Sequence, residues 1–85
     1  MYRIEFSRAA AKTLRRLPRN TADFIRSRIE AVAADPHAQN NNLKKLIGRP
    51  GYRLRVGDWR VIYDLDDVVR VLGVERIAPR GGAYS

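Results

Sequence analysis

The chain has 85 residues, the size of a single domain, and its hydrophobic share of 45% is typical of a folded protein rather than a disordered one. It carries 17 Lys and Arg against 9 Asp and Glu, and a formal net charge of +8 predicts an anionic partner: nucleic acid, an acidic protein or a membrane surface. The absence of cysteine excludes disulfides and thiolate chemistry, and no apolar run reaches the roughly 20 residues of a membrane-spanning helix. We therefore expect one soluble, cytoplasmic domain over residues 1–85, without a membrane partner.

The N-terminal residues predict a strand followed by a helix. Residues 2–6 alternate in polarity and contain strand-forming side chains. Ser7 is a good N-cap for the next segment, and Pro18 would end the helix that it starts. This helix has one apolar stripe, which consists of Phe6, Ala10, Leu14 and Leu17.

A second amphipathic helix is expected directly afterwards. Asn20 or Thr21 would cap its N-terminus, and Asp35-Pro36 would end it. Its buried face has the i, i+3, i+4 spacing of a helix that packs on a core, with Ala22, Ile25, Ile29 and Val32. The two helices form a helical hairpin that would cover one face of a sheet.

Residues 51–63 predict a β-hairpin. Two alternating runs, residues 52–56 and 59–63, flank Gly57-Asp58, which suits a type II′ turn and is also compatible with I′. This turn places Tyr52, Leu54, Val56, Trp59, Val61 and Tyr63 on one face, which we interpret as core.

The opposite face of this hairpin collects Arg53, Arg55, Arg60 and Ile62. Arg55 would lie directly opposite Arg60, and like charges in that position destabilise a sheet. The arrangement therefore suggests that the face binds an anion.

The remaining segments complete a sheet. Residues 43–47 are a short strand or an extended approach, and residues 48–51 are a turn. Residues 64–67 are a polar connection, residues 68–76 are apolar on both faces as a central strand would be, and residues 77–85 are a flexible tail. The order β-α-α-β-β-β predicts an α+β fold, with a small antiparallel-rich β-sheet and an N-terminal helical hairpin packed on one face.

Conventional catalytic groups are scarce. The single histidine, His37, lies in a polar loop, where we expect it to be solvated. The carboxylates Asp64, Asp66 and Asp67 occupy the predicted connection, where Asp is common for reasons of turn geometry. We expect neither a metal site nor a cofactor.

The cations are better placed for chemistry on a phosphate. Arginine donates bidentately and stays charged, so a cluster of arginines would stabilise the charge that develops at a scissile phosphate. An RNA substrate brings its own nucleophile, the 2′-hydroxyl. A tyrosine could accept a proton or stack on a base.

Several motifs resemble the RelE/ParE superfamily of bacterial toxin–antitoxin toxins, and the resemblance covers essentially the whole chain. They are Lys44-Lys-Leu-x-Gly48, the hairpin Gly51-Tyr-Arg-Leu-Arg-Val-Gly-Asp-Trp-Arg-Val-Ile-Tyr63, Val71-Leu-Gly-Val, Arg76 and Arg80-Gly-Gly-Ala-Tyr84. The RelE branch implies a ribosome-dependent mRNA endonuclease that cleaves in the ribosomal A site by 2′-hydroxyl attack, without a metal. Its partners would be mRNA, ribosomal RNA and a cognate antitoxin, usually acidic and partly disordered.

Carried over by position, the resemblance implies a catalytic set of Arg53, Arg55, Arg60, Arg80 and Tyr84, with RNA contacts from Lys44, Lys45 and Arg76. Many members have lysine in the first hairpin strand and His-Arg before the terminal tyrosine motif. Here arginine replaces the lysine, and Ala78-Pro79-Arg80 contains no histidine.

Two alternatives remain open. A ParE-like toxin of the same fold would inhibit DNA gyrase by protein–protein contact and would need no catalytic set. A plain basic module would bind RNA or DNA with a steep salt dependence and no toxicity.

Overall fold

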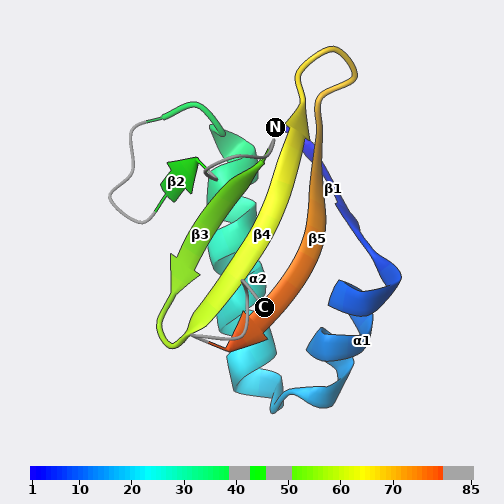
Figure 1. Cartoon of the computed structure of the whole chain (residues 1–85), viewed down its shortest axis with the longest axis vertical. Coiled ribbons are helices and arrows are strands. Elements are labelled where there is room, and N and C mark those ends of the chain that lie inside the picture. The colour runs from blue at the N-terminus through cyan, green and yellow to red at the C-terminus, as the bar shows by residue number, and fades with distance from the viewer. Residues whose placement is uncertain (39–42, 46–50, 80–85) are drawn as a thin grey trace.

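The computed structural model describes residues 1–38, the backbone of residues 43–45, and residues 51–79. Two helices lie on one face of a mixed sheet (Figure 1). The elements follow the order β1 (Arg3–Phe6), α1 (Arg8–Arg16), α2 (Arg19–Ala34), β2 (Leu43–Lys45), β3 (Tyr52–Val56), β4 (Trp59–Asp66) and β5 (Val71–Pro79).

The sheet has the strand order β1-β5-β4-β3-β2, so β5 is an interior strand with a neighbour on each side, as its apolar sequence predicts. β1 pairs with β5 in parallel, while β2–β3, β3–β4 and β4–β5 are antiparallel. The predicted α+β fold with an antiparallel-rich sheet is confirmed. Of the two alternatives for residues 43–47, the strand is the one observed: β2 has three residues and adds one strand to the order β-α-α-β-β-β.

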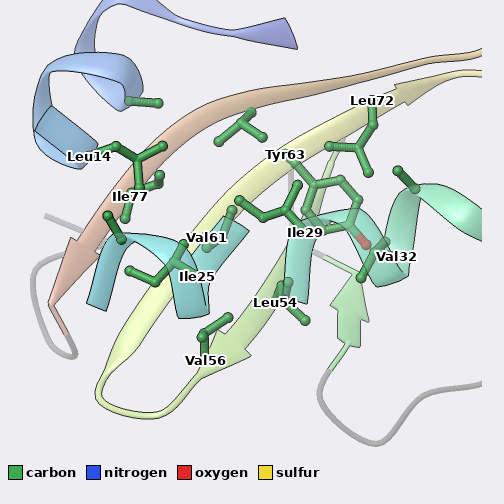
Figure 2. Packing of buried hydrophobic residues seen from close by; sticks show 14 residues of the cluster. Leu14, Ile25, Ile29, Val32, Leu54, Val56, Val61, Tyr63, Leu72 and Ile77 are labelled. Atoms are coloured by element: carbon green, nitrogen blue, oxygen red, sulfur yellow. The ribbon is translucent and has the colours of Figure 1, made fainter. Parts of the chain in front are cut away.

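The core lies between the helices and one face of the sheet. Helix α2 crosses that face, and Figure 2 shows Ile25, Ile29 and Val32 of α2 directed at side chains of β3, β4 and β5. The apolar stripe predicted for this helix is buried as expected, with Ala33 in addition. On the sheet side, the buried residues are Leu54, Val56, Val61, Tyr63, Leu72, Val74 and Ile77.

The two helix starts differ from each other. Ser7 caps α1 as predicted: its Oγ accepts from the Ala10 N–H at 3.0 Å and donates to the Glu75 carbonyl at 2.6 Å, which ties the helix to β5. The predicted cap of α2 by Asn20 or Thr21 is wrong. The helix begins earlier because Pro18 takes the N-cap position, with its carbonyl accepting from the Ala22 N–H, and no side chain caps this end.

The predicted hairpin is confirmed in every pair. Val56 lies opposite Trp59, and the register continues without a shift to the pair of Tyr52 with Tyr63, whose rings stack at 5.4 Å. Gly57 has φ of +58°, and Asp58 lies outside the positive-φ region. This combination is that of a type II′ turn and excludes I′, which needs positive φ at both positions.

The predicted connection between the last two strands is wrong in its position. β4 continues to Asp66, and β5 begins at Val71 and runs to Pro79, so the turn is residues 67–70 and part of the predicted tail is strand. Asp66 lies at the end of β4 rather than in a loop, and its Oδ1 closes the turn by accepting from the N–H groups of Val68 and Val69 at 3.0 and 3.2 Å. Arg70 completes the turn at φ of +57°.

Candidate nucleic-acid interface

Four arginines from three strands share the sheet face that the helices leave uncovered. We call Arg53, Arg55, Arg60 and Arg76 the arginine face. In the register, Arg53 pairs with Ile62 and Ile62 with Arg76, while Arg55 pairs with Arg60. Because side chains alternate along each strand, these arginines point away from the core of Figure 2. The predicted grouping of Arg53, Arg55 and Arg60 is thus confirmed, and Arg76 joins them across β4.

A shift in the β4–β5 register brings Arg76 to this face. Ile62 pairs with Arg76, whereas the next residue, Tyr63, pairs with Val74, so Glu75 is an extra residue in β5. Such a bulge changes the phase of the alternation. Val74 and Ile77, three residues apart, can then both be buried on the core side while Arg76 is exposed on the other.

The arginines differ in their surroundings. Arg60 is only 8% exposed, and its Nη1 donates to the Trp59 carbonyl at 3.1 Å, which fixes part of its position. Ile62 and Ala78 are buried on the same face and form a small apolar pair apart from the main core. Arg55 is exposed and has no ion pair within the described part of the chain. The face therefore offers one anchored guanidinium directly opposite one that is open to a ligand.

Carboxylates occupy the other end of the same sheet face. Asp64 pairs with Gly73, which pairs with Glu5 on the far side. A Cβ at Gly73 would lie 2.6 Å from Asp64 Oδ1, so the missing side chain lets this carboxylate lie across β5. Glu5 also forms an ion pair with Arg3, in which Oε2 lies 3.1 Å from Nη2. The uncovered face is therefore positive near the β3–β4 turn and largely negative towards the β4–β5 turn.

A polar cluster near the β4–β5 turn was missed by the sequence reasoning. Asp67 Oδ1 accepts from the Tyr2 hydroxyl at 2.6 Å and lies 2.8 Å from His37 Nε2. The hydrogen bond from Tyr2, followed by that from His37, lowers the pKa of the Asp67 carboxyl, while the same bond to Asp67 raises the pKa of Tyr2. His37 is exposed as expected, but it is bonded. No local signal could find this cluster, because Tyr2 and Asp67 are 65 positions apart.

This cluster joins the N-terminus, the end of α2 and the β4–β5 turn. That turn lies at the opposite end of β4 from the β3–β4 turn, next to which Arg55 and Arg60 are placed (Figure 1). His37 and Asp67 are therefore far from the arginine face and are positioned to stabilise the fold rather than to act on a ligand bound there.

The remaining predicted site residues are only partly placed. Lys44 pairs with Arg53 in the β2–β3 register, and Lys45 pairs with Tyr52. The backbone of Lys44 is thus in register with a residue of the arginine face, and that of Lys45 with a residue of the core side. Arg80 and Tyr84 lie outside the described residues.

The arginine face suits phosphate in charge and geometry. Guanidinium groups stay protonated, so they donate hydrogen bonds and offset negative charge but do not accept a proton. Among residues 1–38 and 51–79, no group of three or more His, Cys, Asp or Glu side chains is arranged to hold a metal ion, and neither helix is long and apolar enough to span a membrane.

Comparison with solved structures finds toxins of the same fold. The chain is similar to the archaeal RelE–RelB complex from Pyrococcus horikoshii, with 28% identity, a TM-score of 0.80, and coverage of 96% of this chain and 98% of that one. It is similar to the intact Escherichia coli RelBE toxin–antitoxin complex, with 26% identity, a TM-score of 0.77, and coverage of 93% and 96%. The YoeB/ParE toxin from Agrobacterium tumefaciens shares the fold at 14% identity, with a TM-score of 0.77 and coverage of 92% and 98%.

Comparison with curated proteins gives no match. A family model does match: residues 4–84 fit the ParE toxin of the type II toxin–antitoxin system parDE. This match spans nearly the whole chain, and it agrees with the RelE-like topology and with the resemblance of the hairpin motif. The chain therefore belongs to the ParE toxin family, within the RelE/ParE superfamily, and is a toxin of a type II toxin–antitoxin module.

Proposed function

We propose that this toxin is a ribosome-dependent mRNA endonuclease whose arginine face holds the scissile phosphate. The observation that carries the proposal is the direct opposition of Arg55 and Arg60 on a sheet face that the helices leave uncovered. This arrangement costs stability because the two charges repel each other. A phosphate bound between the two guanidinium groups would attract both of them and so offset their mutual repulsion.

In this mechanism the substrate supplies the nucleophile. The 2′-hydroxyl gives up its proton and its oxygen attacks the adjacent phosphorus, while the bond to the 5′-oxygen of the next nucleotide breaks and that oxygen takes up a proton. The products are a 2′,3′-cyclic phosphate and a 5′-hydroxyl. Arg60, held by the Trp59 carbonyl, and the exposed Arg55 would donate to the phosphate oxygens as negative charge builds up on them. Arg53 and Arg76 flank Ile62 and would contact the neighbouring backbone of the RNA.

The proton transfers need groups other than these arginines. On the resemblance to RelE-type toxins, Tyr84 would accept a proton or stack on the base, and Arg80 would complete the cationic set. Lys44 and Lys45 would add contacts to the RNA backbone. These assignments are part of the proposal and can be tested by substitution.

The proposal includes an antitoxin as partner. Two of the similar structures are complexes in which the toxin is bound by its antitoxin. A net charge of +8 favours an acidic partner through electrostatic complementarity, which speeds the encounter. An antitoxin that covers the arginine face would block the access of RNA.

The second candidate is inhibition of DNA gyrase. The observation in its favour is that the matching family model is that of the ParE toxin of parDE. Both candidates involve a toxin, so growth arrest on expression does not separate them.

The separating experiment uses two assays on the same purified toxin. In a reconstituted translation reaction, primer extension on the mRNA reports cleavage at the codon in the ribosomal A site. In a supercoiling reaction, purified gyrase and plasmid DNA report trapped gyrase–DNA complexes. The proposal predicts mRNA breaks that require ribosomes, and unimpaired gyrase. Trapped gyrase complexes with intact mRNA would contradict it.

A further inference from the structure

A second cationic surface lies on α1, on a different element from the arginine face. Four of the nine residues of this helix are cationic, and none is acidic. All four are exposed, and with 3.6 residues per turn they fall within an arc of roughly 100°. We call this surface the α1 stripe, and it consists of Arg8, Lys12, Arg15 and Arg16.

No described residue neutralises the α1 stripe. Within the part of the chain that the structure describes, none of its four side chains takes part in an ion pair or a side-chain hydrogen bond. The other side of the helix is fixed, because Ala10 and Leu14 are buried. Figure 1 shows α1 at the edge of the sheet, beside β5. Because the four cations are exposed whereas Ala10 and Leu14 are buried, the stripe is directed away from the core.

The N-terminal half of this arrangement opposes the local stability of the helix, whereas Arg15 and Arg16 lie in the last turn, where the helix dipole favours positive charge. Arg8 lies in the first turn, where the helix dipole favours negative charge, and no acidic residue is present there. Lys12 is one turn from Arg8 and from Arg16, and like charges at this spacing repel each other. The three consecutive alanines of residues 9–11 are strong helix formers and offset part of this cost.

Helix α2 shows the contrast. Its three arginines, Arg19, Arg26 and Arg28, share the helix with Asp23 and Glu30. Asp23 follows Arg19 by four residues and Glu30 follows Arg26 by four, the spacing that favours opposite charges on one helix face. The positive charge is therefore concentrated on α1, not distributed evenly over the helices.

We infer that the α1 stripe docks on the phosphate backbone of structured RNA, apart from the site that binds the scissile phosphate. No large apolar side chain is exposed on α1, and the small residues Ala9 and Thr13 border the stripe on one side. A protein interface needs buried apolar or aromatic anchors, whereas backbone contacts to a nucleic acid need only cations and polar groups. From Arg8 to Arg16 the helix rises about 12 Å. A double-stranded nucleic acid presents one charge per roughly 1.7 Å of axis, so several phosphates face this length.

This inference rests on the proposed function, because that function is the reason for taking RNA as the ligand, and it adds a second RNA-binding surface to it. The stripe would hold the toxin on its large RNA partner while the arginine face acts on the mRNA. It supplies affinity and orientation rather than chemistry, because it lies on another element. Its loss should therefore weaken binding and leave the chemical step unchanged.

The test compares two triple variants with the same change of charge. One carries Lys12→Gln, Arg15→Gln and Arg16→Gln; the control carries Arg19→Gln, Arg26→Gln and Arg28→Gln on α2. Binding to a naked RNA hairpin with a stem of about 12 base pairs is titrated between roughly 50 and 300 mM salt, where phosphate contacts respond. Removing one cation that neutralises a phosphate lowers the slope of log K against log salt by about 0.9 for a duplex. Because it lacks three of these cations, we expect the α1 variant to show a slope smaller by about 2.7 and an affinity at least roughly tenfold weaker at about 100 mM salt. The control should weaken by less than about threefold.

Two results would overturn the inference. Equal losses of affinity in both variants would mean that only net charge matters. An equal loss of affinity by the α1 variant for poly-L-glutamate would mean that the stripe binds acidic chains in general. A melting temperature close to that of the wild type is expected, because the repulsion lost at Lys12 is offset by the loss of Arg15 and Arg16 from the last turn, where the helix dipole favours cations.

A cleavage assay separates this inference from the proposed function. If wild-type toxin cleaves mRNA on ribosomes, the α1 variant should raise KM with kcat unchanged. If wild-type toxin does not cleave, the proposed function fails, while the hairpin titration still decides for or against the stripe.

Discussion

Replacing Tyr63 with phenylalanine should stabilise the protein. The Tyr63 side chain is 1% exposed, lies in the main core of Figure 2 against α2, and its hydroxyl has no hydrogen-bond partner among the described residues. An unsatisfied buried polar group costs about 1–3 kcal/mol. Removal of one oxygen leaves a small cavity whose cost is roughly 0.3 kcal/mol. The Tyr63→Phe variant should therefore gain about 1–2 kcal/mol, which for a domain of this size raises Tm by roughly 5–10 °C.

The pH dependence provides a second measurement on the same variant. Burial, with a smaller contribution from Tyr52, raises the pKa of the Tyr63 hydroxyl to about 12. Because burial penalises the ionised form, this group leaves the free energy of unfolding unchanged below its ordinary pKa of about 10 and lowers it as the pH rises from about 10 to about 12. A shift of about 2 corresponds to roughly 2–3 kcal/mol, and the phenylalanine variant should not show this loss.

The assay is urea unfolding at about pH 7 and at intervals up to about pH 11.5, with Tyr52→Phe as the matched control. Tyr52 stacks on Tyr63 but is only half-buried, so its variant should stay within about 0.5 kcal/mol of the wild type. A Tyr63→Phe protein that is destabilised by about 1 kcal/mol or more, with an unchanged m-value, would show that the hydroxyl is satisfied in solution and would refute the reasoning.

Three further predictions concern single positions in turns. Gly57→Ala should destabilise the hairpin by about 1 kcal/mol in urea unfolding, because φ of +58° is unfavourable for a residue with a Cβ; Gly57→Asn should cost less. Arg70→Gly should be neutral or stabilising by up to about 1 kcal/mol, since Arg70 already has φ of +57°, and a clear loss of stability would contradict this. Asp67→Asn should lower the free energy of unfolding at about pH 7. Because Tyr2 and His37 lower the pKa of the Asp67 carboxyl, the difference in this free energy from the wild type should shrink as the pH falls below about 4. A difference that persists at about pH 2 would count against the stabilising role of the ionised carboxylate.

The sequence was sufficient to predict those features of the structure that depend on residues close together in the chain. The β3–β4 register follows from a two-residue turn at Gly57-Asp58 and strict alternation on both sides, so every pair and the grouping of Arg53, Arg55 and Arg60 could be predicted. The α2 core stripe likewise follows from helical periodicity. These features depend on neighbours in sequence, where patterns are reliable.

The sequence was insufficient to predict those features that depend on contacts between segments far apart in the chain. Asp64 and Asp66 suggested a loop, yet both lie in β4 because Gly73 and Val71 of β5 pair with them. Propensity alone cannot anticipate such a partner. The Arg76 position depends on a bulge, and the Tyr2–Asp67–His37 cluster joins three remote segments. In the site, the roles of Arg80 and Tyr84 are inferred from the family resemblance, and substitution of each residue tests them.

The central claim is that the arginine face performs mRNA cleavage. The most direct test is primer extension on ribosome-bound mRNA with Arg55→Gln and Arg60→Gln, each compared with Arg70→Gln, which removes the same charge at the opposite end of β4. Because Arg60 is buried, circular dichroism melts establish that its variant is folded, and the exposed Arg55 gives an independent reading. Loss of a donor to developing negative charge lowers kcat by about 100- to 1,000-fold. We predict this loss in folded Arg55→Gln and Arg60→Gln proteins and full cleavage by Arg70→Gln. Wild-type cleavage rates in both face variants would contradict the account.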